Sequence, residues 1–372
     1  MGLRKRIYNK IMAKKHNEEL DLYDLAHGHE LITDHSYRIV DNEHLKDYMS
    51  NNALYIKLFY TFHDKRILLT HHTWWKKTNN DLEAYCKKYI TDLTKRLRIE
   101  KMALTPAELE QKWDLQEYDI PGYEDVLLKA VAIRSWVKND NNKKWVVVVH
   151  GLNSHKFRAI FFGLIYLRLG YNVLVFDQRN HGESTAKITT MGYYEKYDLA
   201  AVVNFLQTTI DPKLKELNFH GWSMGTFVIM EYLKLAFAKN KLINSAILDS
   251  TISNLNALYR YYMLKIKVNY YEHYYAIRRY TIDTRGYDPE QINPGENLDQ
   301  LAKLPVLYLL NRKDHATPYV MGREAYQNKR RYERKKISNR VVFNCDHVRG
   351  IYYNPPQYLA AITAFITNAK RK

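Results

Sequence analysis

The sequence predicts an α/β protein with a mostly parallel central sheet and helices on both faces. From Tyr118 onward, short apolar runs alternate with helical patterns, which is typical of a sheet assembled from βαβ units. Residues 145–149 are a tryptophan followed by four valines, as in a strand buried on both faces. Residues 221–225 have the pattern G-x-S-x-G, which marks a sharp strand-to-helix turn that exposes a serine hydroxyl. We therefore expect a serine above one end of the sheet.

The expected elements follow one another in a regular order. An antiparallel hairpin at residues 126–137 is expected to lead into the sheet. The helix at residues 161–169 ends at Gly170, and the helix at residues 199–210 ends before Pro212, because glycine and proline stop helices. The remaining elements are strands at residues 145–149, 173–176, 217–219, 246–248, 306–310 and 341–343, and helices at residues 227–235 and 359–366.

Two regions stand outside this alternating pattern. Residues 1–115 are expected to form a helical N-terminal extension, and residues 116–372 the catalytic domain. Within that domain, residues 251–303 interrupt the strand order and are expected to form a helical lid, although a helical excursion with ordinary packing is the alternative. The insertion is rich in tyrosine: Tyr259, Tyr261, Tyr262, Tyr270, Tyr271, Tyr274, Tyr275 and Tyr280.

Composition limits the classes of protein that remain. The chain has 57 Lys and Arg residues against 40 Asp and Glu residues, and the formal charge of +17 favours contact with anionic surfaces. No run reaches the roughly 18 apolar residues of a spanning helix, and no secretory signal is recognisable at the start. Two cysteines, Cys86 and Cys345, indicate no disulfide framework. We expect a cytoplasmic protein, with peripheral contact at the inner face of the membrane as an option.

The histidines of the N-terminal extension lack the spacing and the supporting carboxylates of a zinc site. Neither a metal nor a cofactor is therefore expected.

A serine hydroxyl needs a base, and the base needs an acid to orient it. Asp314 follows the strand at residues 306–310, and His347 follows the strand at residues 341–343. The order Ser223, Asp314, His347 is the one that the G-x-S-x-G architecture requires. Asp249 remains an alternative acid, and His315 an alternative base. Asp346 is a further carboxylate beside the expected base.

The developing oxyanion needs backbone N–H donors. Met224, directly after the serine, is expected to supply one donor, and Leu152, in the turn after the strand at residues 145–149, the other. Gly221 and Gly225 are expected to give the turn the room that it needs for close packing.

Residues 118–369 resemble an α/β-hydrolase of the serine esterase, lysophospholipase and acyl-aminoacyl peptidase-like group. The motifs that carry the resemblance are His150-Gly151, residues 177–184 (D-x-R-x-H-G-x-S), residues 221–225, Asp314 with Thr317-Pro318, and Asp346-His347. The resemblance implies a catalytic Ser223, Asp314 and His347, with Arg179 and His181 in a structural loop. This sequence departs from the family pattern at Asn311-Arg312 and at Asp346, where glycines are usual. An adjacent Asp346 carboxylate would raise the pKa of His347 by favouring its charged form.

These observations predict a serine hydrolase that cleaves carboxylic esters through an acyl-enzyme. The substrate is expected to be a small acyl ester, and the tyrosine-rich insertion and basic surface favour lipid or lysophospholipid esters. A peptidase or a thioesterase is the alternative within the same class. The alternative outside it is a basic protein that binds membrane or nucleic acid, suggested by residues 329–336, although no nucleic-acid-binding module is recognisable.

Overall fold

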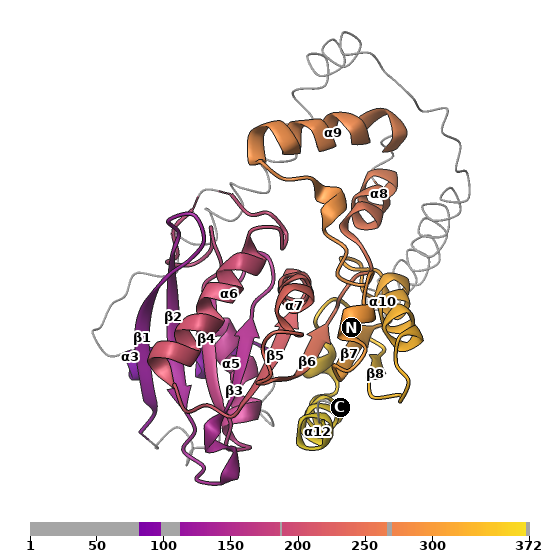
Figure 1. Ribbon diagram of the computed structural model, residues 1–372. Coiled ribbons are helices and arrows are strands. Elements are labelled where there is room, and N and C mark those ends of the chain that lie inside the picture. Colours follow the sequence, from indigo (N-terminus) through magenta and orange to yellow (C-terminus); the bar gives the residue numbers. More distant parts are fainter. Residues whose placement is uncertain (1–81, 98–111, 187, 266–269, 370–372) are drawn as a thin grey trace.

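Eight strands form the central sheet of the computed structural model, which describes residues 82–97, 112–186, 188–265 and 270–369 (Figure 1). The strand order is β1-β2-β4-β3-β5-β6-β7-β8. β1 and β2 pair antiparallel, as do β2 and β4, and all other neighbours are parallel. The bounds are β1 (Asp114–Pro121), β2 (Leu127–Arg134), β3 (Lys144–Val149), β4 (Asn172–Phe176), β5 (Glu216–Trp222), β6 (Ile243–Asp249), β7 (Val306–Asn311) and β8 (Asn339–Phe343). The expected mostly parallel sheet is confirmed.

The hairpin expected at residues 126–137 is wrong, because this segment supplies only one strand, β2, whose hairpin partner is β1. β1 lies at the edge of the sheet, and most of its side chains are exposed or half-buried. An edge strand that carries charged side chains gives little apolar signal, which is why the sequence pattern missed it.

Helices cover both faces of the sheet, as expected (Figure 1). Along β3, Val146 and Val148 pack in one apolar cluster with α5 (Lys156–Leu167) and α12 (Pro355–Asn368). Val147 and Val149 pack in the other with α6 (Glu195–Phe205) and α7 (Met224–Ala236). Successive strand side chains point to opposite faces, so four consecutive valines fill two separate cores.

One helix from before the sheet belongs to the first core. In α3 (Leu82–Leu97), the side chains of Cys86 and Ile90 are 1% exposed and pack in the cluster that contains α5. The Glu83 carboxylate also accepts a hydrogen bond from the backbone N–H of Trp113, just before β1, at 2.8 Å. The rest of the expected N-terminal extension, including its histidines, lies outside the described residues.

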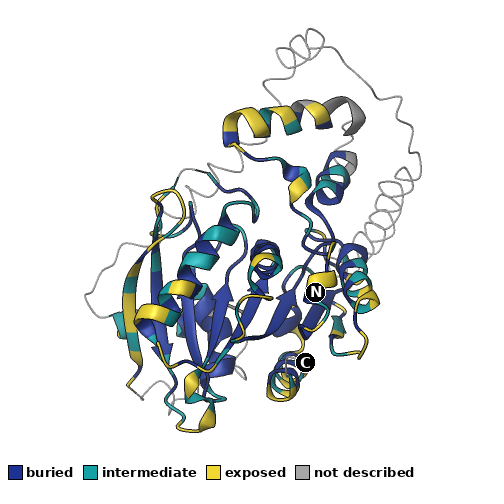
Figure 2. Cartoon of the chain, viewed as in Figure 1, coloured by how far each residue is buried: buried dark blue, intermediate teal, exposed yellow. Residues whose placement is uncertain are grey.

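The insertion after β6 contains α8 (Leu255–Lys265) and α9 (Tyr270–Arg285), followed by short turns η5 (Pro289–Gln291) and η6 (Asp299–Leu301). In Figure 1 both helices stand beyond the C-terminal ends of the strands, with α9 farther out. Figure 2 shows exposed residues along the described part of α9, among them Tyr275 and Ile282. Tyr261 of α8 and Tyr274 of α9 are nevertheless buried, so part of the tyrosine content serves ordinary packing.

Two further helices, α10 (Tyr319–Arg331) and α11 (Gly350–Tyr353), and two short turns complete the elements of the described residues. The turns are the 3-10 turn η3 (Asp140–Lys143) before β3 and the π-helical turn η4 (Leu206–Ile210) after α6. In the portion of the chain that the structure describes, none of the helices has the length and apolar character needed to cross a membrane.

Candidate active site

Ser223 occupies a strained turn between β5 and α7. Its φ of 52° lies in the left-handed region, where a residue with a side chain is uncommon. Glycine stands on both sides of the turn because a side chain at either position would collide with neighbouring atoms. A Cβ at Gly225 would lie 2.2 Å from the Val149 carbonyl oxygen, and one at Gly221 would lie 2.6 Å from Ile229 Cδ1. The turn therefore has the geometry of a nucleophile elbow, as the sequence pattern predicts.

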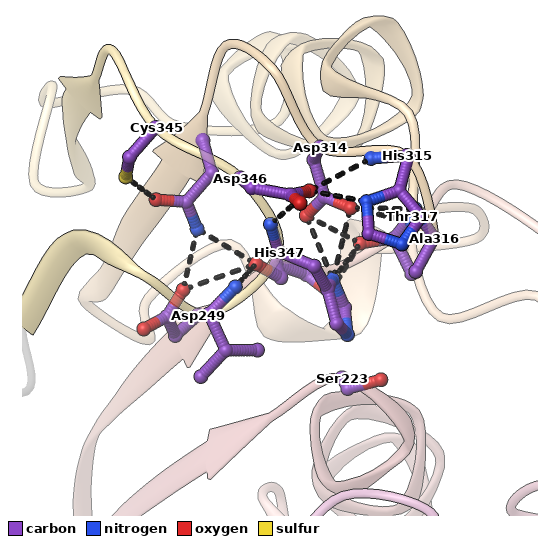
Figure 3. Close-up of polar contacts among 12 residues, drawn as sticks. Ser223, Asp249, Asp314, His315, Ala316, Thr317, Cys345, Asp346 and His347 are labelled. Carbon is purple, nitrogen blue, oxygen red and sulfur yellow. Dashed lines mark hydrogen bonds and ion pairs between the residues drawn. The ribbon is translucent and has the colours of Figure 1, made fainter. Parts of the chain in front are cut away.

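The loops after β7 and β8 bring Asp314 and His347 together (Figure 3). We call residues 311–318 the acid loop and residues 344–349 the base loop. His347 Nδ1 lies 2.9 Å from Asp314 Oδ1 and 2.8 Å from Asp314 Oδ2. The Asp314 side chain is 1% exposed and that of His347 is 21% exposed, so the imidazole keeps an accessible side. A buried carboxylate on Nδ1 would hold the proton there and leave Nε2 free to act as a base.

The acid loop itself orients the Asp314 carboxylate. Oδ1 accepts the backbone N–H groups of Ala316 at 2.9 Å and Thr317 at 2.8 Å. Oδ2 accepts the Thr317 hydroxyl at 3.0 Å, and the same hydroxyl lies 3.2 Å from His347 Nδ1. Thr317 is a residue of the site whose role the sequence did not assign, although it stands in the motif that identified the acid.

Ser223 lies next to the His347 ring in Figure 3, on the opposite side from the Asp314 carboxylate. No direct hydrogen bond joins the serine and histidine side chains in this part of the described chain. Such bonds are often long in structures without substrate and shorten when the substrate is bound.

The alternative base, His315, has a different partner. Its Nδ1 pairs with Asp346 Oδ1, and its backbone N–H donates to the same oxygen at 3.3 Å. Asp346 also accepts the backbone N–H of His347 at 2.6 Å, and no contact with the His347 ring is present. Burial raises the pKa of the Asp346 carboxyl, but the bonds from His315 and from the His347 backbone outweigh burial and lower it. Asp346 thus pairs with the alternative base and holds the backbone of the proposed one.

The alternative acid, Asp249, is fully buried at the end of β6 and makes no hydrogen bond to His347. Its Oδ2 accepts the Tyr358 hydroxyl at 3.0 Å, and its Oδ1 accepts Asn311 Nδ2 at 3.0 Å. Burial raises the pKa of this carboxyl to about 6, although the Tyr358 bond and the nearby His347 charge act in the opposite direction.

The expected oxyanion donors come from two segments that meet beside Ser223. Met224 begins α7, and Leu152 follows Gly151, where an added Cβ would lie 3.0 Å from Ser223 Cβ. The buried Met224 side chain belongs to an apolar cluster with Phe227, Leu258 and Tyr287, and half-buried Leu152 packs against it. This cluster connects the elbow to the insertion.

The loop at residues 177–184 is held internally. The Asp177 carboxylate accepts the backbone N–H of Lys156 at 2.6 Å and its buried ammonium at 2.7 Å. Arg179 pairs with Asp198 through two bonds of 2.6 and 3.0 Å. The sequence did not single out Lys156, because a lysine at the start of a helix is ordinarily exposed. In the described ranges, no group of three or more His, Cys, Asp and Glu side chains is arranged to hold a metal ion.

Comparison with known proteins gives consistent matches. A family model described as the alpha/beta hydrolase fold matches residues 144–263. The uncharacterized protein YqkD of Bacillus subtilis is 24% identical over 255 residues, 68% of this chain and 76% of its own length. The esterase Pf2001 of Pyrococcus furiosus is 26% identical with a TM-score of 0.54, covering 72% of this chain and 95% of the esterase. Acylaminoacyl peptidase of Pyrococcus horikoshii shares the fold, at 13% identity and a TM-score of 0.51, over 70% of this chain and 42% of its own.

The sheet, the elbow and these matches define an α/β-hydrolase fold. The similarity of the chain to this family model and to an esterase supports a hydrolase.

Proposed function

We propose that the protein is a serine hydrolase that cleaves carboxylic esters through an acyl-enzyme. The observation that carries the proposal is the short contact of His347 Nδ1 with the buried Asp314 carboxylate, at 2.8 and 2.9 Å, beside a serine at a positive-φ elbow. A positive φ at a serine is strained, and strained residues of this kind cluster at active sites, where the strain belongs to the mechanism.

In the proposed reaction, His347 Nε2 takes the hydroxyl proton as Ser223 Oγ attacks the ester carbonyl. The Leu152 and Met224 backbone N–H groups stabilise the oxyanion, and Asp314 stabilises the imidazolium that forms. His347 returns the proton to the leaving alcohol, and the acyl group stays on Ser223. A water molecule, activated by the same imidazole, then attacks the acyl-enzyme and releases the acid.

The surroundings of the elbow favour an apolar acyl group. The side chains around it include Met224, Phe227 and Leu258, with half-buried Met191 and Tyr193 packed against the same cluster. An acyl chain gains free energy by removing such surfaces from water, about 25 cal/mol per Å² of apolar area. We therefore propose acyl esters, including lipid and lysophospholipid esters, as the substrate class.

Labelling of the purified protein with a fluorescent fluorophosphonate tests the proposal. Wild type is expected to label and to hydrolyse p-nitrophenyl esters, with the rate reported for each acyl chain length. Ser223→Ala should abolish both activities. Ser245→Ala, a buried serine at the other end of the sheet, is the matched control and should retain them.

The acid is tested with the same substrates. Asp314→Asn should lower kcat by about 10³ to 10⁴-fold, because the amide favours the wrong imidazole tautomer. Folded wild type that neither labels nor turns over esters would contradict the proposal. Faster cleavage of acyl-peptide or thioester substrates than of any oxygen ester would move the assignment to a peptidase or a thioesterase.

A further inference from the structure

A buried polar network lies behind the acid and base loops, and the proposed mechanism does not use it. Its centre is Asn311, the last residue of β7, which is 2% exposed. Asn311 Nδ2 donates to Asp249 Oδ1 at 3.0 Å and to Ser250 Oγ at 2.7 Å. Asn311 Oδ1 accepts the Cys345 thiol at 3.0 Å. One amide group therefore joins the ends of β6 and β7 to the base loop. Two of its partners, Asp249 and Cys345, are labelled in Figure 3.

Ser250 carries the connection to His347. Its hydroxyl donates to Asp249 Oδ1 at 3.2 Å and accepts the backbone N–H of Val348 at 3.1 Å. Val348 directly follows the proposed base and has a φ of 51°, which is strained for a β-branched residue. Ser250 itself has a φ of 59°. Two strained residues in contact need surroundings that hold them, and the hydrogen bonds of Asn311 and Asp249 supply such support.

The same serine reaches the acid loop. Its carbonyl oxygen accepts the Thr317 hydroxyl at 3.1 Å, and that hydroxyl also donates to Asp314 Oδ2. Ser250 therefore contacts both loops, one through its hydroxyl and the other through its backbone. A displacement of Ser250 would move the imidazole and the carboxylate relative to each other.

On these contacts, and resting on the proposed function, we propose that Asn311 and Asp249 are positioning residues for His347. Acting through Ser250, they fix the backbone of the base loop at Val348 and so hold the imidazole beside Ser223. Neither residue touches the reacting atoms.

The network has defined neighbours on every side. Asp249 faces Tyr358 of α12, whose hydroxyl lies 3.5 Å from His220 of β5. The charged and titratable groups nearest to Asn311 and Asp249 in the two loops are Cys345, His347 and Asp314. Replacing Asn311 by aspartate would place a second carboxyl group directly against Asp249.

The first test compares Asn311→Ala with Asn244→Ala. Asn244 is a buried asparagine on β6 as well, but at the opposite end of the strand, where it bonds Glu216 and Asn218. Asn311→Ala should lower kcat for a short p-nitrophenyl ester by about 10 to 100-fold with KM within about twofold, because small misplacements of a catalytic group cost this much. Asn244→Ala should leave kcat within about twofold while it lowers the melting temperature comparably.

Asn311→Asp provides a second test that keeps the side-chain shape. When one proton is shared between the two carboxyl groups, a donor is restored, and when that proton is lost the like charges repel. The ratio of kcat/KM between Asn311→Asp and wild type should therefore fall at least about fivefold from pH 5.5 to pH 8.5.

The outcomes separate the two proposals. Wild type that labels with fluorophosphonate, together with an Asn311→Ala kcat equal to that of Asn244→Ala, would overturn this inference and leave the proposed function intact. A ratio for Asn311→Asp that stays flat with pH would also overturn it, even if the alanine variant does not fold. Wild type without labelling or turnover would overturn both.

Discussion

At the scale of single residues, strain collects around the candidate site. Ser223, Ser250 and Val348 all have φ between 51° and 59°, and each lies at the C-terminal end of a strand or in a loop that follows one. Backbone strain of this kind costs on the order of 1–3 kcal/mol per residue and persists only where surrounding contacts impose it. Here those contacts include the Asp249 carbonyl, which accepts the Ser223 N–H at 2.9 Å, and the Ser250 hydroxyl. The protein thus holds its proposed nucleophile, and the residue that follows its proposed base, in backbone conformations that are unfavourable without these contacts.

Asp249 gives a prediction about stability. Its pKa rises from 3.8 to about 6 on folding, so the stability it contributes is complete below about pH 4 and is lost as pH rises through 6. Asparagine does not titrate. The melting temperature of Asp249→Asn minus that of wild type should therefore increase between pH 4 and pH 7. The shift of about two pKa units corresponds to roughly 3 kcal/mol.

Thermal and urea unfolding across this pH range would check the prediction, and the same measurements on Asp346→Asn, extended below pH 4, give a control of opposite sign. The pKa of Asp346 is lowered on folding, so its contribution is present at neutral pH and disappears in acid. If the melting temperature of Asp249→Asn minus that of wild type decreases as pH rises, ionisation of the buried Asp249 carboxyl does not destabilise the folded protein.

The residue-level expectations for the site rest on loop positions along the chain. Sequence order favoured Ser223, Asp314 and His347 over Asp249 and His315, because parallel strands end at one edge of the sheet and their loops meet there. It left Asp249 and His315 open as alternatives. That choice depends on which way a side chain points: Asp249 lies buried against Tyr358, and His315 turns to Asp346. The sequence showed that Asn311 replaces a glycine that is usual in the family, but it did not show the three hydrogen bonds that the Asn311 side chain makes.

At the scale of elements, the basic run that begins near the end of α10 lies only partly at the surface. The Lys329 side chain is fully buried, and its ammonium bonds Glu333 at 2.6 Å, whereas Arg331, Arg334, Lys335 and Lys336 are exposed. Burial lowers the pKa of Lys329, while the Glu333 bond and charge act against that shift. Glu333 also accepts the backbone N–H groups of Ile337 and Ser338 at 3.1 and 3.2 Å. The pair thus joins the end of α10 to the turn before β8.

Glu333→Ala should destabilise the protein by about 3–5 kcal/mol, because it leaves a buried ammonium without a partner. Urea unfolding of this variant beside Arg334→Ala, an exposed neighbour, measures the effect, and the control should change stability by less than about 0.5 kcal/mol. Similar values for the two variants would mean that the Lys329 ammonium reaches water.

The insertion contacts the site through one further bond. The Tyr262 hydroxyl of α8 donates to the Ala316 carbonyl of the acid loop at 2.7 Å. The position of α8 is thereby tied to the loop that carries Asp314. Whether the insertion acts as a lid remains a prediction of the sequence.

At the scale of the whole molecule, the two apolar cores extend beyond the sheet and its covering helices. Ile90 of α3 is 1% exposed within the core that includes α5 and α12. If α3 unfolds together with the body, Ile90→Ala should lower the stability of the whole protein by about 2–4 kcal/mol, in one transition. Lys88→Ala, on the exposed side of the same helix, is the control.

Unfolding followed by both circular dichroism and tryptophan fluorescence would report this effect. An unchanged midpoint for Ile90→Ala, with loss of only a small helical signal, would instead mean that α3 opens independently of the sheet.

The sequence by itself determined the order along the chain of the strands from β3 to β8 and of the helices α5, α6, α7 and α12. It also determined that helices cover both faces of the sheet, and it supplied the three residues proposed for catalysis. These follow from local patterns: β-branched runs, helical periodicity and glycines where the backbone must turn tightly. Only the tertiary structure decided the antiparallel partner of β2, the burial of Lys329 and the network that joins Asp249, Asn311 and Val348. These features depend on contacts between residues up to 98 positions apart, and no local pattern records which side of a loop faces inward.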